Sequence, residues 1–373
     1  MIDQDKEQKK FTAVKYADYL RLEQLLGAQK RRSEELASPA HDEMLFIIVH
    51  QVYELWFKQI IHELKSVIGM FLSDNVDERN IGIAVGRLSR VIDIQKLLIE
   101  QIRVMESMTP LDFLDFRNYL FPASGFQSFQ FRQMEALLGL PPDNRITYNN
   151  SPYSTVFNDE ERADLQAIEA GANLLRAVES WLERTPFLEL KGFNFLEQYK
   201  AAVQKMTEKE QEAIRASSFL SDHEKEMRIQ LIGNTQTYFQ NVFDEEKHEE
   251  LVAEGRLRLS YKATIAALLL NLYRDEPILH MPFNLLQKLM DVDEFLTVWR
   301  YRHAQMVLRM LGMKVGTGGS SGYSYLHKTA VEHHIYIDLH NISTLLIPRS
   351  ELPDLPEHLK RELGFYFTSN PLG

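Results

Sequence analysis

The chain has 373 residues, of which 45% are apolar and 25% charged, proportions typical of a globular protein with a sizeable core. It has no cysteine, which excludes a disulfide framework and thiolate ligation of a metal. With 42 basic and 53 acidic residues its formal net charge is −11, which argues against binding to nucleic acid or to an anionic membrane surface.

The N-terminal region gives no sign of a targeting or membrane segment. Residues 1–10 are charged and lack the apolar core of a signal peptide. The longest apolar run near this end, Met44–Val49, is far shorter than the roughly 20 residues of a membrane span. We therefore expect a cytoplasmic protein that binds neither nucleic acid nor membrane.

Helical periodicity dominates the chain, and no convincing run of alternating strand residues appears. Ser38 and Pro39 are typical of an N-cap and a first helical residue, and they predict one long helix that reaches about Leu64. The highly charged residues 200–257 predict solvated helices. Apolar patterns predict further helices over residues 81–106, 163–184, 260–273, 284–312 and 329–347.

Together these elements predict an all-α fold with one main helical core. Proline and glycine clusters separate the expected helices, and there is no internal repeat or low-complexity linker. The alanine- and leucine-rich helix over residues 260–273 is expected to be buried. The charged region at about residues 190–258 is expected to be a small peripheral helical excursion from the core.

His50 lies on one face of the first long helix together with Phe46, Tyr53 and Glu54, at spacings of three and four residues. Two interpretations of this histidine stay open. A lone histidine on an apolar face is most often a core residue that is bonded to a carbonyl. Alternatively, it is a polar group in an apolar pocket that binds substrate or moves a proton.

His303 interrupts an apolar stripe formed by Trp299, Met306, Val307 and Met310. Core packing explains a single histidine of this kind. A haem ligand needs the same arrangement, because the macrocycle requires apolar neighbours and the iron requires one imidazole with little water around it.

Two segments have the composition of anion sites. Residues 316–322 contain four of the 17 glycines of the chain, and such a loop exposes backbone N–H groups. Residues 109–132 place Arg117 and Arg132 among seven aromatic side chains. An arginine in apolar surroundings needs an anionic partner, which is either a buried carboxylate of the protein or the carboxylate of a ligand.

Motif spacing argues against other metal or phosphate chemistry. A helical di-iron site needs two Glu-x-x-His pairs, and the chain has only Glu245 with His248. There is no His-Glu-x-x-His zinc motif and no P-loop. His333, His334 and His340 lie close together but are more typical of structural histidines than of ligands. Haem is therefore the metal cofactor that the residues favour.

A specific pattern emerges from four segments, which are residues 44–60 (MLFIIVHQVYELWFKQI), 109–132, 299–303 (WRYRH) and 316–323 (GTGGSSGY). In this order they resemble the tryptophan 2,3-dioxygenase family, and the resemblance extends from about Tyr16 to Arg349. It implies an all-helical fold that binds haem b and assembles as a homotetramer, a dimer of dimers. It also implies the family's reaction, in which O2 cleaves the indole C2–C3 bond of L-tryptophan to give N-formylkynurenine, the first step of tryptophan degradation by the kynurenine pathway.

The same resemblance implies roles for individual residues. His303 matches the axial ligand of the haem iron, and His50 matches the distal histidine that contacts the indole N–H. Arg117 matches the arginine that pairs with the substrate carboxylate, and Thr317 matches the threonine at the amino and carboxylate end of the substrate. Further positions match residues beside the haem or the substrate, namely Phe46, Phe113, Ser124, Gly125, Arg132 and Trp299.

The N-terminal residues 1–40 match an arm that reaches a neighbouring subunit in this family. Within it, Tyr16, Tyr19 and Leu20 match residues that close the neighbour's pocket. Residues 41–373 would then form the helical, haem-binding catalytic domain.

Three alternatives to this function stay open. One is a haem enzyme of the same superfamily that inserts a single oxygen atom into an indole or acts on another tryptophan-like substrate. The mass of the product would reveal whether one or two oxygen atoms were added. The others are a haem sensor, which has no need of Arg117, Thr317 and a closing arm together, and a helical scaffold with core histidines. Phe113 stands where some members of the family have tyrosine, so one hydrogen bond to the substrate carboxylate is expected to be missing.

Overall fold

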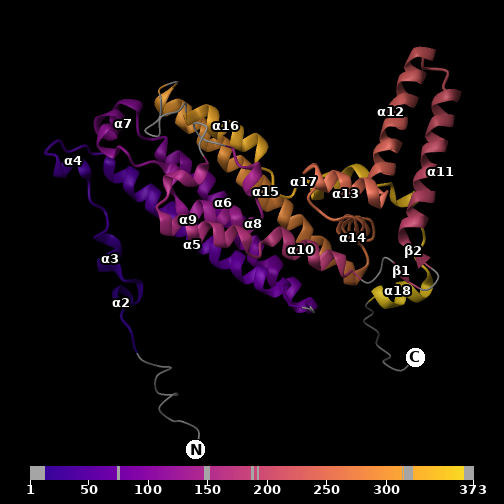
Figure 1. Cartoon of the computed structure of the whole chain (residues 1–373), viewed down its shortest axis with the longest axis horizontal. Helices are drawn as coiled ribbons and strands as arrows, with labels where there is room; N and C mark the ends of the chain where they lie inside the picture. Colours follow the sequence, from indigo (N-terminus) through magenta and orange to yellow (C-terminus); the bar gives the residue numbers. More distant parts are fainter. Residues whose placement is uncertain are drawn as a thin grey trace, which may run out of the picture.

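The computed structural model describes residues 13–73, 76–146, 152–185, 189–190, 193–312, 314 and 322–364. These residues are largely helical (Figure 1), and the prediction of an all-α fold is confirmed. The α-helices are, in chain order, α2 (Tyr16–Leu20), α3 (Leu22–Leu26), α4 (Arg32–Glu35), α5 (Glu43–Phe71), α6 (Glu78–Met105), α7 (Pro110–Arg117), α8 (Phe129–Leu138), α9 (Asp159–Ala170), α10 (Leu174–Glu183), α11 (Phe195–Ala216), α12 (Asp222–Val242), α13 (Glu245–Ala253), α14 (Tyr261–Leu272), α15 (Pro277–Leu311), α16 (Gly322–Glu332), α17 (Ile337–Asn341) and α18 (Glu357–Leu363).

Short elements connect these helices. The described strands, β1 (Glu189–Leu190) and β2 (Phe193–Asn194), form one antiparallel pair. The 3₁₀ helices are η2 (Asn118–Leu120), η3 (Gly125–Gln127), η4 (Pro142–Asn144), η5 (Tyr153–Val156), η6 (Ile342–Leu345) and η7 (Arg349–Glu351).

The main core lies among the long helices. α15 runs along α6 and α16, and α5 packs against α6 and α8 (Figure 1). Fully buried side chains such as Leu64, Leu88, Val91 and Leu289 fill the space between them. Burying one such side chain contributes about 1.5–3 kcal/mol, so this core holds the helices in fixed positions relative to one another.

Gly139 allows α8 and α10 to pack closely. It ends α8 with a φ of +112°, a left-handed conformation that glycine adopts without strain. A Cβ atom at this position would lie 2.6 Å from the Cβ of Leu175, so any other residue would push α10 away.

The first long helix begins later than predicted, at Glu43 rather than at Ser38. The backbone N–H of Ser38 donates to the carbonyl oxygen of Ser33, and that of Ala40 donates to the Ser33 hydroxyl, so this segment folds back on α4. The buried Glu43 carboxylate accepts the N–H groups of Arg32 and Ser33 at 2.7 and 2.9 Å. A long-range cap of this kind has no signature in the local sequence.

Two expected helices are each divided in the structure. The helix predicted over residues 163–184 breaks at Gly171, and α10 starts afresh because the Asn173 side chain accepts the N–H of Arg176 at 3.0 Å. The helix predicted over residues 329–347 breaks between α16 and α17. There the buried Asp293 carboxylate accepts the N–H groups of Ile335 and Tyr336, which replaces helical hydrogen bonds.

Other helix predictions are confirmed to within a few residues. α6 covers the predicted residues 81–105, and α14 is buried along ten consecutive residues, as its composition predicted. α15 ends at Leu311 with Gly312 as its C-cap, as expected, but begins at Pro277 instead of residue 284. Proline is favoured in the first turn of a helix, which explains the earlier start.

Two regions extend away from the core (Figure 1). α11 and α12 form a hairpin that projects at one end of the molecule, with Phe219 almost fully exposed between them. α2 and α3 form an arm at the N-terminal side and contain no buried residue. Tyr16 and Tyr19 on this arm are each 74% exposed, which is unusual for large aromatic side chains.

α5 is long and apolar enough to cross a membrane by length and composition alone, although the short apolar run in the sequence predicted no such helix. Within the described part of the chain it is the one helix of this kind. Its C-terminal half, which includes Phe57, Ile60 and Leu64, is buried in the core. Of the 18-residue apolar window that passes this test, 22% is buried within the chain.

Candidate active site

A cavity of about 280 Å³ lies between α5, α6, α7, α8, α15 and α16. Its walls come from segments that are far apart in the sequence. The predicted site residues that line it are His50, Phe113, Arg117, Ser124, Gly125, Arg132, Trp299 and His303.

His50 enters this cavity from α5 with one ring nitrogen already bonded. Its Nδ1 lies 2.7 Å from the carbonyl oxygen of Phe46. Because a carbonyl can only accept, Nδ1 carries the proton in the neutral ring and Nε2 is left as an acceptor. The side chain keeps exposed surface and lines the cavity, and desolvation by the surrounding protein lowers the pKa of His50, against the opposing effects of the Phe46 carbonyl and Glu54.

His303 enters from α15, and no hydrogen bond to its ring is found among the described residues. The indole of Trp299 stacks on it with ring centroids 5.2 Å apart and planes inclined by 19°. Burial, together with the nearby His50, lowers the pKa of His303 to about 4. The ring is therefore neutral near pH 7 and has a nitrogen lone pair available to a ligand.

Aromatic rings surround His50. The Phe46 ring lies 4.1 Å from the His50 ring and 5.8 Å from that of Phe113, measured between centroids. The buried Phe116 completes this cluster with an edge contact to Phe113 at 5.4 Å. We call this part of the cavity, with His50 and His303, the imidazole end.

α7 brings Phe113 and Arg117 to the cavity. The helix starts with Pro110 and a capping box, in which the Thr109 hydroxyl accepts the N–H of Asp112 and the Asp112 carboxylate accepts the N–H of Thr109. Phe113 and Arg117 are one turn apart and so share a face. A ligand that stacks on the phenyl ring of Phe113 therefore also lies near the Arg117 guanidinium.

Glu54 joins α5 to the segment that carries the remaining predicted residues. Its carboxylate accepts hydrogen bonds from the Ser128 hydroxyl at 2.6 Å and from the Gln130 amide at 2.8 Å. Ser124 caps the 3₁₀ helix η3, which presents Gly125 to the cavity.

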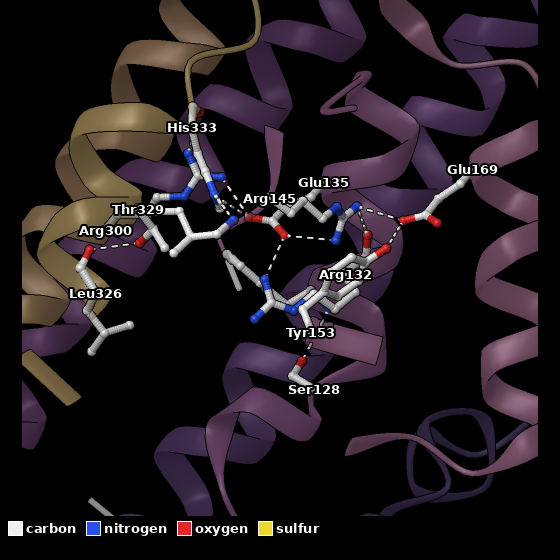
Figure 2. A network of polar contacts seen from close by, with 12 residues as sticks. Ser128, Arg132, Glu135, Arg145, Tyr153, Glu169, Arg300, Leu326, Thr329 and His333 are labelled. Atoms are coloured by element: carbon white, nitrogen blue, oxygen red, sulfur yellow. Dashed lines mark hydrogen bonds and ion pairs between the residues drawn. The ribbon is translucent and has the colours of Figure 1, made fainter. Parts of the chain in front are cut away.

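The opposite wall is highly charged (Figure 2). The Glu135 carboxylate on α8 pairs with Arg132 at 2.9 Å and with Arg300 of α15 at 2.7 Å. Arg145 lies 3.4 Å from the same carboxylate, and His333 is beside it. We call this part of the cavity the charged end.

The ionisation of the charged end is settled by these contacts. Burial alone would raise the pKa of Glu135, but Arg132, His333 and two further arginines hold it well below its usual value. Burial alone would also lower the pKa of Arg132, but Glu135 and the Tyr325 hydroxyl raise it. The pair is therefore fully charged near neutral pH.

Sequence reasoning missed several residues of this wall. It left the partner of Arg132 open between a protein carboxylate and a ligand, and Glu135 is such a carboxylate. The sequence did contain a sign of this pair, because Glu135 follows Arg132 by three residues on a helix with an apolar face. Arg300 and Tyr325 also line the cavity. Arg300 lies within the 299–303 motif, but the sequence assigned no role to it, and Tyr325 lies outside the four motifs.

Some predicted residues lie elsewhere or outside the described part of the chain. Phe46 stands behind His50 and is not among the described lining residues. Tyr16, Tyr19 and Leu20 are exposed on the arm, and none of them is among the described lining residues of this chain's own cavity. Thr317 belongs to residues 315–321, which lie outside the described residues.

The sequence was also compared with models of known protein families. A family model described as tryptophan 2,3-dioxygenase matches residues 2–346. The chain belongs to the tryptophan 2,3-dioxygenase family. The resemblance seen in the sequence is thereby confirmed.

Similar proteins extend over nearly the whole chain. The tryptophan 2,3-dioxygenase of Bdellovibrio bacteriovorus is 49% identical over 96% of this chain and 100% of its own length. That of Dictyostelium discoideum is 47% identical over 94% of this chain and 88% of its own length. Tryptophan 2,3-dioxygenase B of Danio rerio is 45% identical over 93% of this chain and 85% of its own length.

Tryptophan 2,3-dioxygenases are generally haem-dependent, and the residues of this cavity fit a haem. His303, a neutral imidazole with no hydrogen bond from the described residues, is the kind of group that binds haem iron. Trp299 and Met306 supply apolar surface in the same cavity, and Arg132 is a cationic residue of its wall.

Proposed function

We propose that this chain catalyses the reaction of O2 with L-tryptophan in which the indole C2–C3 bond is cleaved and N-formylkynurenine forms, the first step of the kynurenine pathway. Membership of the tryptophan 2,3-dioxygenase family supports this assignment. The observation that carries it is the pair His50 and His303, which line one cavity with ring nitrogens available to ligands.

His303 would hold haem b through its unbonded ring nitrogen. The bound haem supplies the iron centre that activates O2. Trp299, Arg132 and Gly125 contribute to the same pocket, since all three line the cavity. The lowered pKa of His303 supports this role, because only a neutral imidazole can ligate iron.

The protein's own contribution is to bind and orient the substrate. The Arg117 guanidinium would pair with the tryptophan carboxylate, and Thr317 with the amino and carboxylate end. Nε2 of His50 would accept the indole N–H, since Nδ1 is already committed to the Phe46 carbonyl. Holding the indole in one orientation converts an encounter into a near-attack arrangement.

The aromatic cluster would keep water from the reacting carbon atoms. Phe113 lines the cavity, and Phe46 supports both Phe113 and His50 from behind. Ser124, which caps η3, also lines the cavity. Both oxygen atoms of O2 remain in the product, so no external reductant is consumed in the overall reaction.

We further propose a homotetramer, a dimer of dimers, in which residues 1–40 close the cavity of a neighbouring subunit. The exposed side chains of Tyr16, Tyr19 and Leu20 support this, because they lack contacts with a core in their own chain. Leu55 and Leu97 on the outer face of α5 and α6 are also half exposed beside an apolar groove. Light scattering of the haem-loaded protein tests the tetramer, and a monomer would contradict it.

Residues 41–373 would form the catalytic domain, with the charged helices at about 190–258 as its excursion. We place the protein in the cytoplasm. The packing of α5 against α6, α8 and α10 supports this location.

Aerobic turnover of L-tryptophan by the reduced, haem-reconstituted protein tests the reaction. With ¹⁸O2 we expect a product that carries two labelled oxygen atoms. A product with one labelled atom would instead identify an indole monooxygenase. A haem spectrum without any product would leave a haem-binding protein of another function, and no haem spectrum would favour a helical scaffold.

A further inference from the structure

We propose that Arg145 and Glu169, which lie behind Glu135, leave the charged end with one uncompensated positive charge. We propose that this charge favours the binding of haem by attracting its carboxylates. This inference rests on the proposed function, since it takes haem as the resident ligand. It assigns a role to an ion pair that touches neither substrate nor haem.

The charges are connected through one carboxylate (Figure 2). Glu135 Oε2 lies 2.9 Å from Arg132 Nη1 and 3.4 Å from Arg145 Nη1, and Glu135 Oε1 lies 2.7 Å from Arg300 Nη2. Arg145 Nη2 in turn lies 3.3 Å from Glu169 Oε1. We call these five residues the Glu135 cluster.

The cluster holds three positive and two negative charges. Burial lowers the pKa of the adjacent His333, so that ring is neutral near pH 7. Burial also raises the pKa of Tyr153, which hydrogen bonds to Glu169 and stays protonated. One positive charge is therefore left uncompensated within the cluster.

This surplus lies in a place where water screens it poorly. The side chains of Arg145 and Glu135 are each 1% exposed, and that of Arg300 is 3% exposed. Burying an uncompensated charge is costly unless an anion approaches it. Glu54 also lines the cavity, but its described hydrogen bonds go to Ser128 and Gln130, and no ion pair joins it to the cluster among the described residues. The anion is therefore expected from the ligand.

Arg132 is the residue through which the cluster would meet that ligand. Its side chain is 8% exposed, the largest value among the three arginines, and it lines the cavity. Arg145 is not among the described lining residues, and its guanidinium stacks over the Tyr153 ring at 4.4 Å. Arg145 and Glu169 thus act at a distance, as positioning residues that set the charge felt at Arg132.

The test compares the affinity of the apoprotein for haem with that for haem dimethyl ester, in which the carboxylates are esterified. The ratio of the two affinities measures recognition of the carboxylates and cancels general effects on folding. Three variants change the charge of the cluster without touching a cavity residue. R145M removes the surplus, E169Q increases it to two, and the double variant R145M/E169Q restores it to one.

We expect the ratio to follow the charge and not the identity of the side chains. The ratio of haem affinity to ester affinity should fall on the order of tenfold in R145M and rise by a similar factor in E169Q. This is the effect expected when one unit charge is removed at ~10 Å from the ligand carboxylate at an effective dielectric constant of ~20. The double variant should return to the ratio of the natural protein. Circular dichroism and thermal unfolding of each apoprotein check that it is folded.

Equal ratios in all folded variants would overturn the inference, as would a double variant that behaves like R145M. If R145M does not fold, E169Q and the double variant still separate the charge from a structural role. Failure of the proposed function looks different, because the natural protein would then bind neither haem nor its ester.

Discussion

The two ends of the cavity satisfy their polar groups in opposite ways. At the imidazole end, Nε2 of His50 and the ring of His303 have no hydrogen-bond partner among the described residues. At the charged end, both oxygens of Glu135 pair with arginines. Unpartnered atoms are available to ligands, whereas paired charges fix the wall and its net charge. Substitutions at the two ends should therefore change different measurable properties.

The largest effect is expected at His303. His303→Ala removes the proposed iron ligand, so haem absorption and turnover should both fall to background while the apoprotein still folds. His280→Ala, an exposed histidine on the same helix, is the control and should change neither. An H303A protein with the haem spectrum of the natural chain would show that another residue holds the iron.

Substitutions at the charged end should change the free energy of unfolding. Removing one partner of a buried ion pair costs about 3–5 kcal/mol, so we expect Glu135→Gln to lower the free energy of unfolding by that amount at pH 7. Glu100→Gln, which alters an exposed pair on α6, should change it little. Denaturant unfolding of both apoproteins measures the difference.

The same variant has a pH signature. The pKa of Glu135 in the folded protein lies below the ordinary value of 4.5, so its stabilising contribution is present above that pH. The contribution is lost as the pH falls from about 4.5 through the lowered pKa. The gap between the natural protein and E135Q should therefore narrow in acid, and a gap that is constant with pH would contradict the assigned ionisation.

Arg117 tests whether the imidazole end also binds the substrate carboxylate. Arg117→Met should lower kcat/KM for tryptophan by about 30-fold to several thousand-fold, which corresponds to about 2–5 kcal/mol for a truncated buried charge pair. A substrate analogue without the carboxylate should be affected far less by the same substitution. Arg103→Met, an exposed arginine on α6, is the control. A nearly unchanged Michaelis constant for tryptophan would remove Arg117 from the site.

His50 should affect turnover more than haem binding. Loss of its acceptor nitrogen leaves the indole N–H unpaired, so His50→Ala should lower kcat/KM by about 5- to 150-fold, or about 1–3 kcal/mol. His62→Ala, an exposed histidine on α5, serves as the control. Equal losses of haem affinity and turnover in H50A would assign His50 to the cofactor instead.

The protonation of His50 should also determine how kcat/KM falls at acidic pH. The pKa of His50 is lowered from 6.5, so the ring is still neutral at pH 6.5 and slightly below it. A neutral ring can accept a hydrogen bond. We expect kcat/KM to stay flat as the pH falls through 6.5 and to decline only in more acidic solution. H50A should lack that decline, and an unchanged decline in H50A would assign it to another group.

Much of this fold could be predicted from the sequence because its helices carry their signals locally. The apolar stripe of α6 and the composition of α14 are properties of the segments themselves. The errors arose where distant side chains decide the backbone. Glu43 caps α4 and Asp293 separates α16 from α17, and neither contact has a local signature.

The site divides in the same way. His50, Arg117 and His303 stand out because each is a polar residue in an apolar or aromatic context. The Glu135 cluster has no such contrast, since its members come from separate segments and only the fold brings them together. A motif indicates which groups meet a ligand, but the charge of the wall around them emerges only from tertiary packing.

The smallest effect is expected at Phe113, where the imidazole end can be refined rather than broken. A tyrosine hydroxyl would add a donor next to Arg117, one turn away on α7. Phe113→Tyr should therefore lower the Michaelis constant for tryptophan about two- to tenfold, by about 0.5–1.5 kcal/mol, with kcat nearly unchanged. Phe116→Tyr is the matched contrast, because the ring of Phe116 is fully buried and its new hydroxyl would destabilise the fold without improving binding. A higher Michaelis constant in F113Y would mean that the carboxylate does not approach this ring.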